Sequence, residues 1–228
     1  MNNVNNETRI QEFKQILLAT KRQGIENVLN WLEKSSDFFR APSSTNYHCN
    51  YEGGLLEHSL NVYYTAIDIY NSLKLKSSKR LENISETNIA IAALLHDICK
   101  INLYQETVKW KKDDNGEWQQ YLGYKINDVM PLGHGEKSVI ILQMLGLQMT
   151  LEEMLAIRWH MGSWDGALLS DTAKFSYNTA NEKFPLCVIL QSADCLSASI
   201  LEEKKEMKII SFYFLINTKI IVILYVTI

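Results

Sequence analysis

The stretch IAIAALLHDICKI, residues 89–101, joins a strongly apolar run to the adjacent pair His96 and Asp97. Ser85 or Thr87 can cap a helix that begins before this run and continues to its end. An unpaired carboxylate among Leu, Ile and Ala costs several kcal/mol to bury, and a divalent cation removes that cost. We therefore expect a buried helix whose histidine and aspartate both reach one metal ion.

Beyond this stretch, apolar residues recur every three or four positions over most of the chain, which is typical of amphipathic helices. Thr150 and Glu153 form a capping-box pattern at the start of one such segment. The expected helices cover residues 8–40 with a candidate break at Gly24, about 55–74, about 135–145, about 151–157, and a last helix from 184–185 through Leu196 that ends in the charged run 202–208. Residues 162–177 are expected to be rich in loops.

Residues 106–127 break this helical rhythm. Two segments of alternating character flank the turn Asp113-Asp114-Asn115-Gly116, and Asn-Gly is a favoured hairpin turn. The pattern predicts a β-hairpin inserted between helices. The predicted fold class is therefore all-α, a helical bundle with a small β-hairpin insertion.

Composition limits the class of protein. The chain has 228 residues, enough for one domain with a large core, and a formal net charge of −3. This charge argues against stable binding of duplex nucleic acid. The N-terminus MNNVNNETRI has no apolar secretion signal, and the four cysteines are scattered without a CxxC pair. We expect a cytoplasmic protein.

Residues 209–228 differ from the rest of the chain, because their only charge is Lys219 and β-branched residues dominate. Three interpretations stay open. The tail forms a strand pair around Asn217-Thr218-Lys219, or it is a C-terminal membrane anchor, the one way in which this protein would meet a membrane. Otherwise it derives from a shifted reading frame, which we favour slightly because the isolated segment would aggregate.

Three further histidines and one further acid lie on or beside separate predicted helices. They are His58, His134, His160 and Asp194. A lone histidine near a helix face is more often a hydrogen-bonded structural residue than a ligand. Neutral imidazoles are nonetheless good nitrogen ligands, and one cation would compensate both Asp97 and Asp194.

The ordered set His58, His96-Asp97 and Asp194 resembles the H…HD…D signature of HD-domain metal-dependent phosphohydrolases. The surrounding sequences GGLLEHSLNV, ALLHDICKI and LQSADCLSA are similar to the motifs of that family. His134 and His160 resemble the additional ligands of its two-metal members. The resemblance covers about residues 50–200. The Gly-Tyr-Pro motif of the cyclic-dinucleotide phosphodiesterase branch is absent, so that activity is not expected.

The resemblance implies a bundle with the metal site in its middle. It implies that residues 46–208 form the HD domain, that helices in residues 1–45 pack on it, and that 209–228 is a separate tail. His58, His96, Asp97 and Asp194 would hold a first divalent transition metal (Mn, Fe, Co, Ni or Zn). Asp97 would bridge to a second ion held by His134 and His160.

Metal-activated water explains how such a site would cleave a phosphomonoester or phosphodiester without a side-chain nucleophile. The expected partner is a small phosphorylated substrate, a nucleotide or short oligonucleotide. Asp97 and Lys100 are the predicted catalytic residues, although Lys100 is as well placed to pair with an acid as with phosphate. Lys137 and Arg158 are further candidates for substrate binding. The alternatives are a di-iron oxygenase with the same ligands and a non-catalytic nucleotide-binding module.

Overall fold

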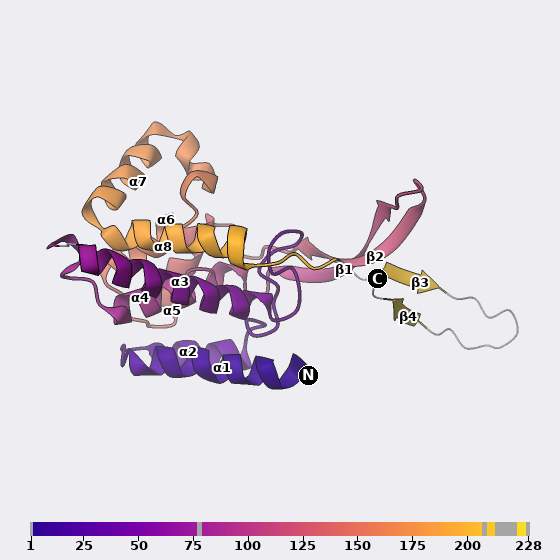
Figure 1. Cartoon of the computed structure of the whole chain (residues 1–228), viewed down its shortest axis with the longest axis horizontal. Helices are drawn as coiled ribbons and strands as arrows, with labels where there is room; N and C mark the ends of the chain where they lie inside the picture. The colour runs from indigo at the N-terminus through magenta and orange to yellow at the C-terminus, as the bar shows by residue number, and fades with distance from the viewer. Residues whose placement is uncertain (1, 77–78, 207–208, 213–222, 227–228) are drawn as a thin grey trace, which may run out of the picture.

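The computed structural model describes the whole chain except residues 1, 77–78, 207–208, 213–222 and 227–228. The described residues form eight α-helices and a β-sheet at one end (Figure 1), which confirms the predicted fold class. The helices are α1 (Asn2–Ala19), α2 (Ile25–Lys34), α3 (Gly54–Lys76), α4 (Glu86–Leu95), α5 (His134–Met144), α6 (Leu151–Trp159), α7 (Asp171–Lys183) and α8 (Pro185–Leu196). The strands are β1 (Tyr104–Lys112), β2 (Trp118–Ile126), β3 (Ile209–Phe212) and β4 (Ile223–Val226).

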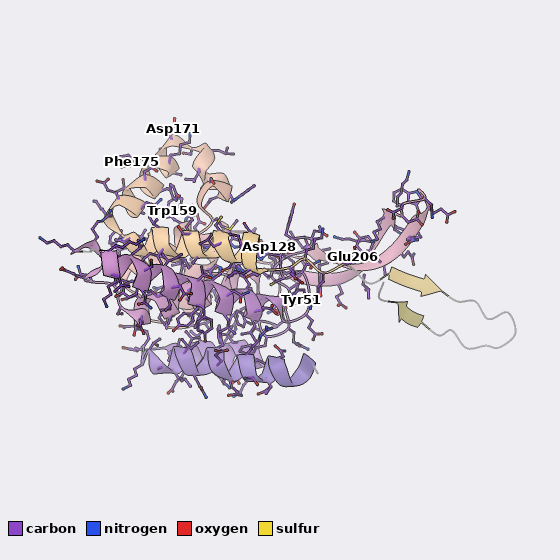
Figure 2. The ribbon with its side chains drawn as sticks, in the orientation of Figure 1. Tyr51, Asp128, Trp159, Asp171, Phe175 and Glu206 are labelled. Atoms are coloured by element: carbon purple, nitrogen blue, oxygen red, sulfur yellow. The ribbon has the colours of Figure 1, made fainter. Side chains whose placement is uncertain are left out.

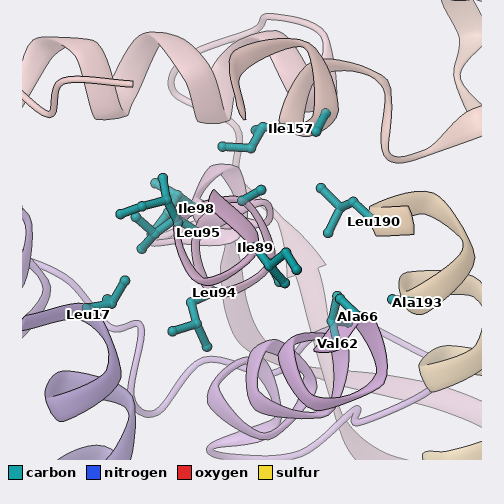
Figure 3. Packing of buried hydrophobic residues seen from close by; sticks show 14 of the residues in the cluster. Leu17, Val62, Ala66, Ile89, Leu94, Leu95, Ile98, Ile157, Leu190 and Ala193 are labelled. Atoms are coloured by element: carbon teal, nitrogen blue, oxygen red, sulfur yellow. The ribbon is translucent and has the colours of Figure 1, made fainter. Parts of the chain in front are cut away.

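Helix α4 is the centre of the bundle. Every residue from Ile89 to Leu95 is buried, so this helix has no polar face. A helix that is apolar all round is stable only when other elements surround it. Figure 3 shows α4 enclosed by side chains of α1, α3, α6 and α8, labelled Leu17, Val62, Ala66, Ile157, Leu190 and Ala193.

Helices α4 and α6 begin in the same way. In α4 the Ser85 hydroxyl accepts from the backbone N–H of Asn88, whose side chain accepts from the Ser85 N–H. Thr150 and Glu153 make the same reciprocal pair at the start of α6. Both capping predictions are confirmed. Such a box satisfies two backbone donors that a helix start otherwise leaves unpaired.

The helix predicted to continue through residue 101 ends at Leu95, and that prediction is wrong. His96 and Asp97 form a turn, and a 3-10 turn follows at Ile98–Lys100. The N–H of Cys99 bonds the Ser138 hydroxyl, and the N–H of Lys100 bonds the Asp97 carbonyl. These partners replace the α-helical pattern, so the chain turns as it leaves the core.

Helix α7 begins at Asp171, within residues 162–177, where the sequence indicated loop. The loop prediction is wrong for its second half, although two 3-10 turns do occupy Gly162–Trp164 and Gly166–Leu169. Only Ala180 of α7 is buried, so the helix leaves little apolar periodicity in the sequence. It projects from the bundle, and Asp171 and Phe175 mark its outer part in Figure 2.

Strands β1 and β2 pair antiparallel around the Asn115-Gly116 turn, as predicted, and extend away from the helices (Figure 1). Strand β3 pairs with β4, and Tyr121 of β2 is the register partner of Ile209. Of the three interpretations of the tail, the strand pair agrees with this pairing, but its predicted turn at residues 217–219 lies outside the described residues. The shifted-frame interpretation and the domain boundaries stay predictions.

No single helix within the described ranges is long and apolar enough to cross a membrane. One pair, Asp171–Lys183 with Pro185–Leu201, meets the length and composition together but bends by 103°.

A buried carboxylate ties three elements together at the start of α6. Glu153 has no exposed surface and accepts two hydrogen bonds of 2.7 Å from the Arg22 guanidinium. It also accepts from the Asn88 side chain at 2.8 Å, in addition to its part in the capping box. The α1–α2 turn and the first turns of α4 and α6 therefore depend on one side chain.

Replacing Glu153 with Gln should destabilise the fold by about 3 kcal/mol, because glutamine preserves the cap but leaves the Arg22 charge without its partner. The free energy of unfolding is measured by urea denaturation. Glu26→Gln, at an exposed position of α2, is the control and should change stability by less than about 0.5 kcal/mol. Equal unfolding midpoints for the two variants would contradict this role of Glu153.

Candidate metal centre

The structure brings all six predicted metal ligands together from five helices or helix ends. His58 lies in α3, His96 and Asp97 follow α4, His134 begins α5, His160 follows α6 and Asp194 lies in α8. Four of them have at most 2% of their surface exposed, namely His58, His96, Asp97 and His160. The centre therefore sits where the central helix α4 ends.

The two carboxylate oxygens of Asp97 face two different groups of side chains. Its Oδ2 lies 3.4 Å from the Nε2 atoms of both His58 and His96. Its Oδ1 lies 2.7 Å from His134 Nε2 and 3.5 Å from His160 Nε2. This is the placement expected of a carboxylate that bridges two ion positions.

Asp194 completes the group on the Oδ2 side of Asp97. Its Oδ1 lies 3.2 Å from His58 Nε2 and 4.0 Å from His96 Nε2. Two imidazoles and two carboxylates thus converge on this side, and two imidazoles and one shared carboxylate converge on the other. The division agrees with the ligand sets that the resemblance implied for a first and a second ion.

Two of the histidines are oriented by their own helices. His96 Nδ1 lies 2.7 Å from the Ala93 carbonyl oxygen, and His160 Nδ1 lies 2.7 Å from the Ile157 carbonyl oxygen. A carbonyl only accepts, so each Nδ1 carries a proton, and in the neutral ring Nε2 presents a lone pair to the centre. Both residues terminate a helix, and the partial negative charge of a helix C-terminus favours a nearby cation.

The unsatisfied nitrogen atoms of the centre fit a metal ion. His160 Nε2 is buried and has no hydrogen-bond partner among the described residues. The Nε2 atoms of His58 and His96 lie 3.2 Å apart, although the Nδ1 atom of each ring has its own acceptor. Two lone pairs that face each other in a buried site need a proton or a cation between them. Four imidazole nitrogens and two carboxylates suit Mn, Fe, Co, Ni or Zn.

The pKa shifts of His58 and Asp194 in the metal-free protein also indicate that the centre needs a positive charge. Burial alone would lower the pKa of His58, but the carboxylates of Asp194, Asp97 and Glu202 outweigh burial and raise this pKa well above its usual range. Burial would raise the pKa of Asp194, but the hydrogen bond and charge of His58 hold it below its usual range. A proton on His58 thus supplies positive charge where an ion would otherwise supply it.

Lys100 pairs with the same carboxylate. Its Nζ lies 2.6 Å from Asp97 Oδ2, and burial would lower the pKa of Lys100, but the charge of Asp97 outweighs burial and raises it. The structure therefore shows Lys100 paired with an acid. This is one of the two roles that the sequence left open, the other being phosphate binding. One oxygen can accept from Lys100 and still coordinate an ion, because it has two lone pairs.

Helix α5 approaches the end of α6 closely, and this contact brings His134 to His160. A Cβ atom on Gly135 would lie 2.2 Å from the carbonyl oxygen of Arg158, so a side chain there would push the two helices apart. The rings of His134 and His160 have centroids 5.2 Å apart as a result. The His134 side chain is 29% exposed and that of Asp194 is 19% exposed, so the centre is most open beside these two ligands.

The two predicted substrate-binding cations are already paired. Lys137 is buried and lies 2.6 Å from Asp128. Arg158 pairs with Glu136 and Asp165 and stacks on the Trp159 ring. Within the described part of the chain, neither is in ion-pair distance of the six ligands. Their role in substrate binding stays a prediction.

The structure adds Glu202, His48 and Cys99, which the sequence interpretation did not assign to the site. Glu202, predicted to begin a charged run, is fully buried at its side chain and contacts His58 and His48. Cys99 Sγ lies 3.4 Å from both ring nitrogens of His134, and burial raises the pKa of this thiol to about 12. Nothing local in the sequence marks Glu202, since it lies 144 residues from His58.

The comparisons with known proteins agree with the geometry. The HD-domain family model matches residues 55–199. This segment covers more than half of the chain and contains all six of the converging predicted ligands. No curated protein and no solved structure gives a significant match.

Addition of Mn²⁺ or Co²⁺ should stabilise the protein, because an ion that binds only the folded state shifts the folding equilibrium. The expected gain is about 2.7 kcal/mol when the metal is 100-fold above its dissociation constant. The measurement is the thermal unfolding midpoint before metal, after metal and after a chelator. His160→Gln is the matched control and should show a smaller rise. A midpoint that metal leaves unchanged would contradict the metal centre.

Proposed function

The chain belongs to the HD-domain family, and on this premise we propose that it is a metal-dependent phosphohydrolase that cleaves a phosphomonoester or phosphodiester of nucleotide type. The observation that carries the proposal is Asp97, whose two oxygens face two separate pairs of histidines. A carboxylate that can bridge two ion positions supports two-metal phosphoester hydrolysis, in which two neighbouring ions stabilise the attacking and leaving oxygens.

When bound, the divalent ions lower the pKa of a coordinated water to about 7 and compensate the charge of phosphate oxygens. The protein contributes orientation and exclusion of water. The backbone hydrogen bonds of His96 and His160 orient both rings, so that their Nε2 lone pairs point toward the ion positions beside Asp97. Burial of these side chains limits solvent to the side of His134 and Asp194, where we place the phosphate of the substrate.

Lys100 is the cation best placed to assist. Its ammonium lies 2.6 Å from Asp97, and its side chain is 11% exposed. Lys100 is therefore close to the centre and partly open to solvent. A fixed positive charge there would stabilise the charge that develops on phosphoryl oxygens. Lys137 and Arg158 would contact phosphate only after exchanging carboxylate partners.

The substrate is proposed to be small. Only a small part of the proposed metal centre is open to solvent, beside His134 and Asp194. The formal net charge of −3 also offers no overall attraction to a long polyanion. A nucleotide or a short oligonucleotide in the cytoplasm fits both conditions.

Changing Asp97 to Asn should abolish phosphoester turnover, because the amide has only one oxygen and no charge to share between two ions. The assay uses p-nitrophenyl phosphate, bis-p-nitrophenyl phosphate and nucleotides with Mn²⁺, Co²⁺ or Fe²⁺. Asp68→Asn, at an exposed position of α3, is the control and should retain wild-type turnover.

The same assay separates the rival functions. Oxygen consumption by the iron-loaded protein without phosphate release would identify an oxygenase. Tight nucleotide binding without turnover would identify a binding module. Either result refutes the hydrolase proposal.

Lys100→Gln should lower kcat by about 100-fold, the cost of losing one charged donor to a transition state. The metal content should not fall, since Lys100 is not a ligand and Asp97 keeps both carboxylate oxygens for the ions. Steady-state kinetics and elemental analysis are measured together, with Lys34→Gln on the surface as the control. An unchanged kcat would restrict Lys100 to pairing with Asp97.

A further inference from the structure

His58 differs from the other buried histidines in how its ring is held. His96 and His160 terminate helices and bond the free carbonyl three residues earlier. His58 lies within α3, where the helix itself uses the carbonyl groups. Its Nδ1 therefore needs a partner from elsewhere in the chain.

Glu202 is that partner. Its Oε1 and Oε2 lie 2.9 Å and 3.1 Å from His58 Nδ1. The carboxylate is acceptor-only when ionised, and its side chain has no exposed surface. A buried charge at this position is stable only because donors surround it.

Two further side chains fix the orientation of the carboxylate. His48 Nδ1 lies 2.6 Å from Oε2, and the Asn61 amide donates to Oε1 at 3.2 Å. The His48 and His58 rings lie with their centroids 4.8 Å apart. The carboxylate therefore cannot rotate away from His58 without losing these contacts.

We propose that Glu202 is a positioning residue of the metal centre: it accepts the Nδ1–H of His58 and so directs the Nε2 lone pair of His58 at the ion position between Asp97 and Asp194. His48 is the residue that holds Glu202 in place. This inference rests on the proposed metal centre and adds residues that lie outside the ligand set.

Hydrogen bonds to the backbone of residues 203 and 205 explain why Glu202 stays in position although it follows the last helix. The N–H of Cys49 donates to the carbonyl of Glu203 at 3.0 Å. Asn50 and Lys205 exchange two hydrogen bonds, of 2.8 Å and 2.9 Å. Residues 202–205 are thus bonded to the loop at 48–50, and the segment continues toward the hairpin, where Figure 2 labels Glu206. Glu202, the first residue of the charged run, therefore belongs to the surroundings of the proposed metal centre.

Co²⁺ titration of the full chain tests this role. Glu202→Leu removes the acceptor at similar volume and should weaken Co²⁺ binding by about 10–100-fold, the usual cost of losing such a partner. The visible absorption of bound Co²⁺ should also change, because the His58 ring is reoriented. Glu202→Gln, which keeps one acceptor oxygen, should lose less. Glu203→Leu is the control, at the exposed neighbouring position, and should bind as wild type.

The unfolding midpoint of each metal-free variant verifies that it folds. If Glu202→Leu does not fold, Glu202→Gln carries the test, with weaker binding and an altered spectrum still expected. Wild-type affinity and spectrum in the folded Glu202 variants would overturn the positioning role. A wild-type chain that binds no Co²⁺ would instead overturn the metal centre itself, so the two failures are distinguishable.

Discussion

The carboxylate of Asp97 is the constraint on which the centre of this bundle depends. It is 2% exposed, and a charge so deeply buried requires compensation from several directions. Burial would raise its pKa, but Lys100 and the surrounding histidines outweigh burial and hold the pKa of Asp97 well below its usual range. The helices must therefore be arranged so that their polar side chains meet at this one point.

The bundle meets this requirement with helix ends. Helices α4 and α6 each begin with a capping box and are each followed directly by a histidine whose Nδ1 bonds the carbonyl three residues earlier. The box fixes where each helix starts, and the end of α4 depends on tertiary partners such as Ser138, whose hydroxyl accepts from the Cys99 N–H. The position of each imidazole is therefore a consequence of helix length and packing.

The sequence predicted those parts of the site that local chemistry determines. An aspartate within an apolar run, such as Asp97 or Asp194, and the Thr150–Glu153 box each have a physical explanation within a few residues. Glu202 has no such local signal, because its role depends on a contact with His58 across 144 residues. The termination of α4 at Leu95 depends on tertiary partners such as Ser138, and α7 buries too little apolar surface to show a period.

The position of Glu202 also connects the centre to the sheet. β1 begins shortly after Lys100, and β3 begins shortly after the segment that contains Glu202, so both strands follow residues that contact predicted metal ligands. The hairpin is closed at its base where the N–H of Asn127 donates to the carbonyl of Leu103. The centre is held by the helices on one side and, on the other, by residues 202–205, which are bonded to the loop at 48–50.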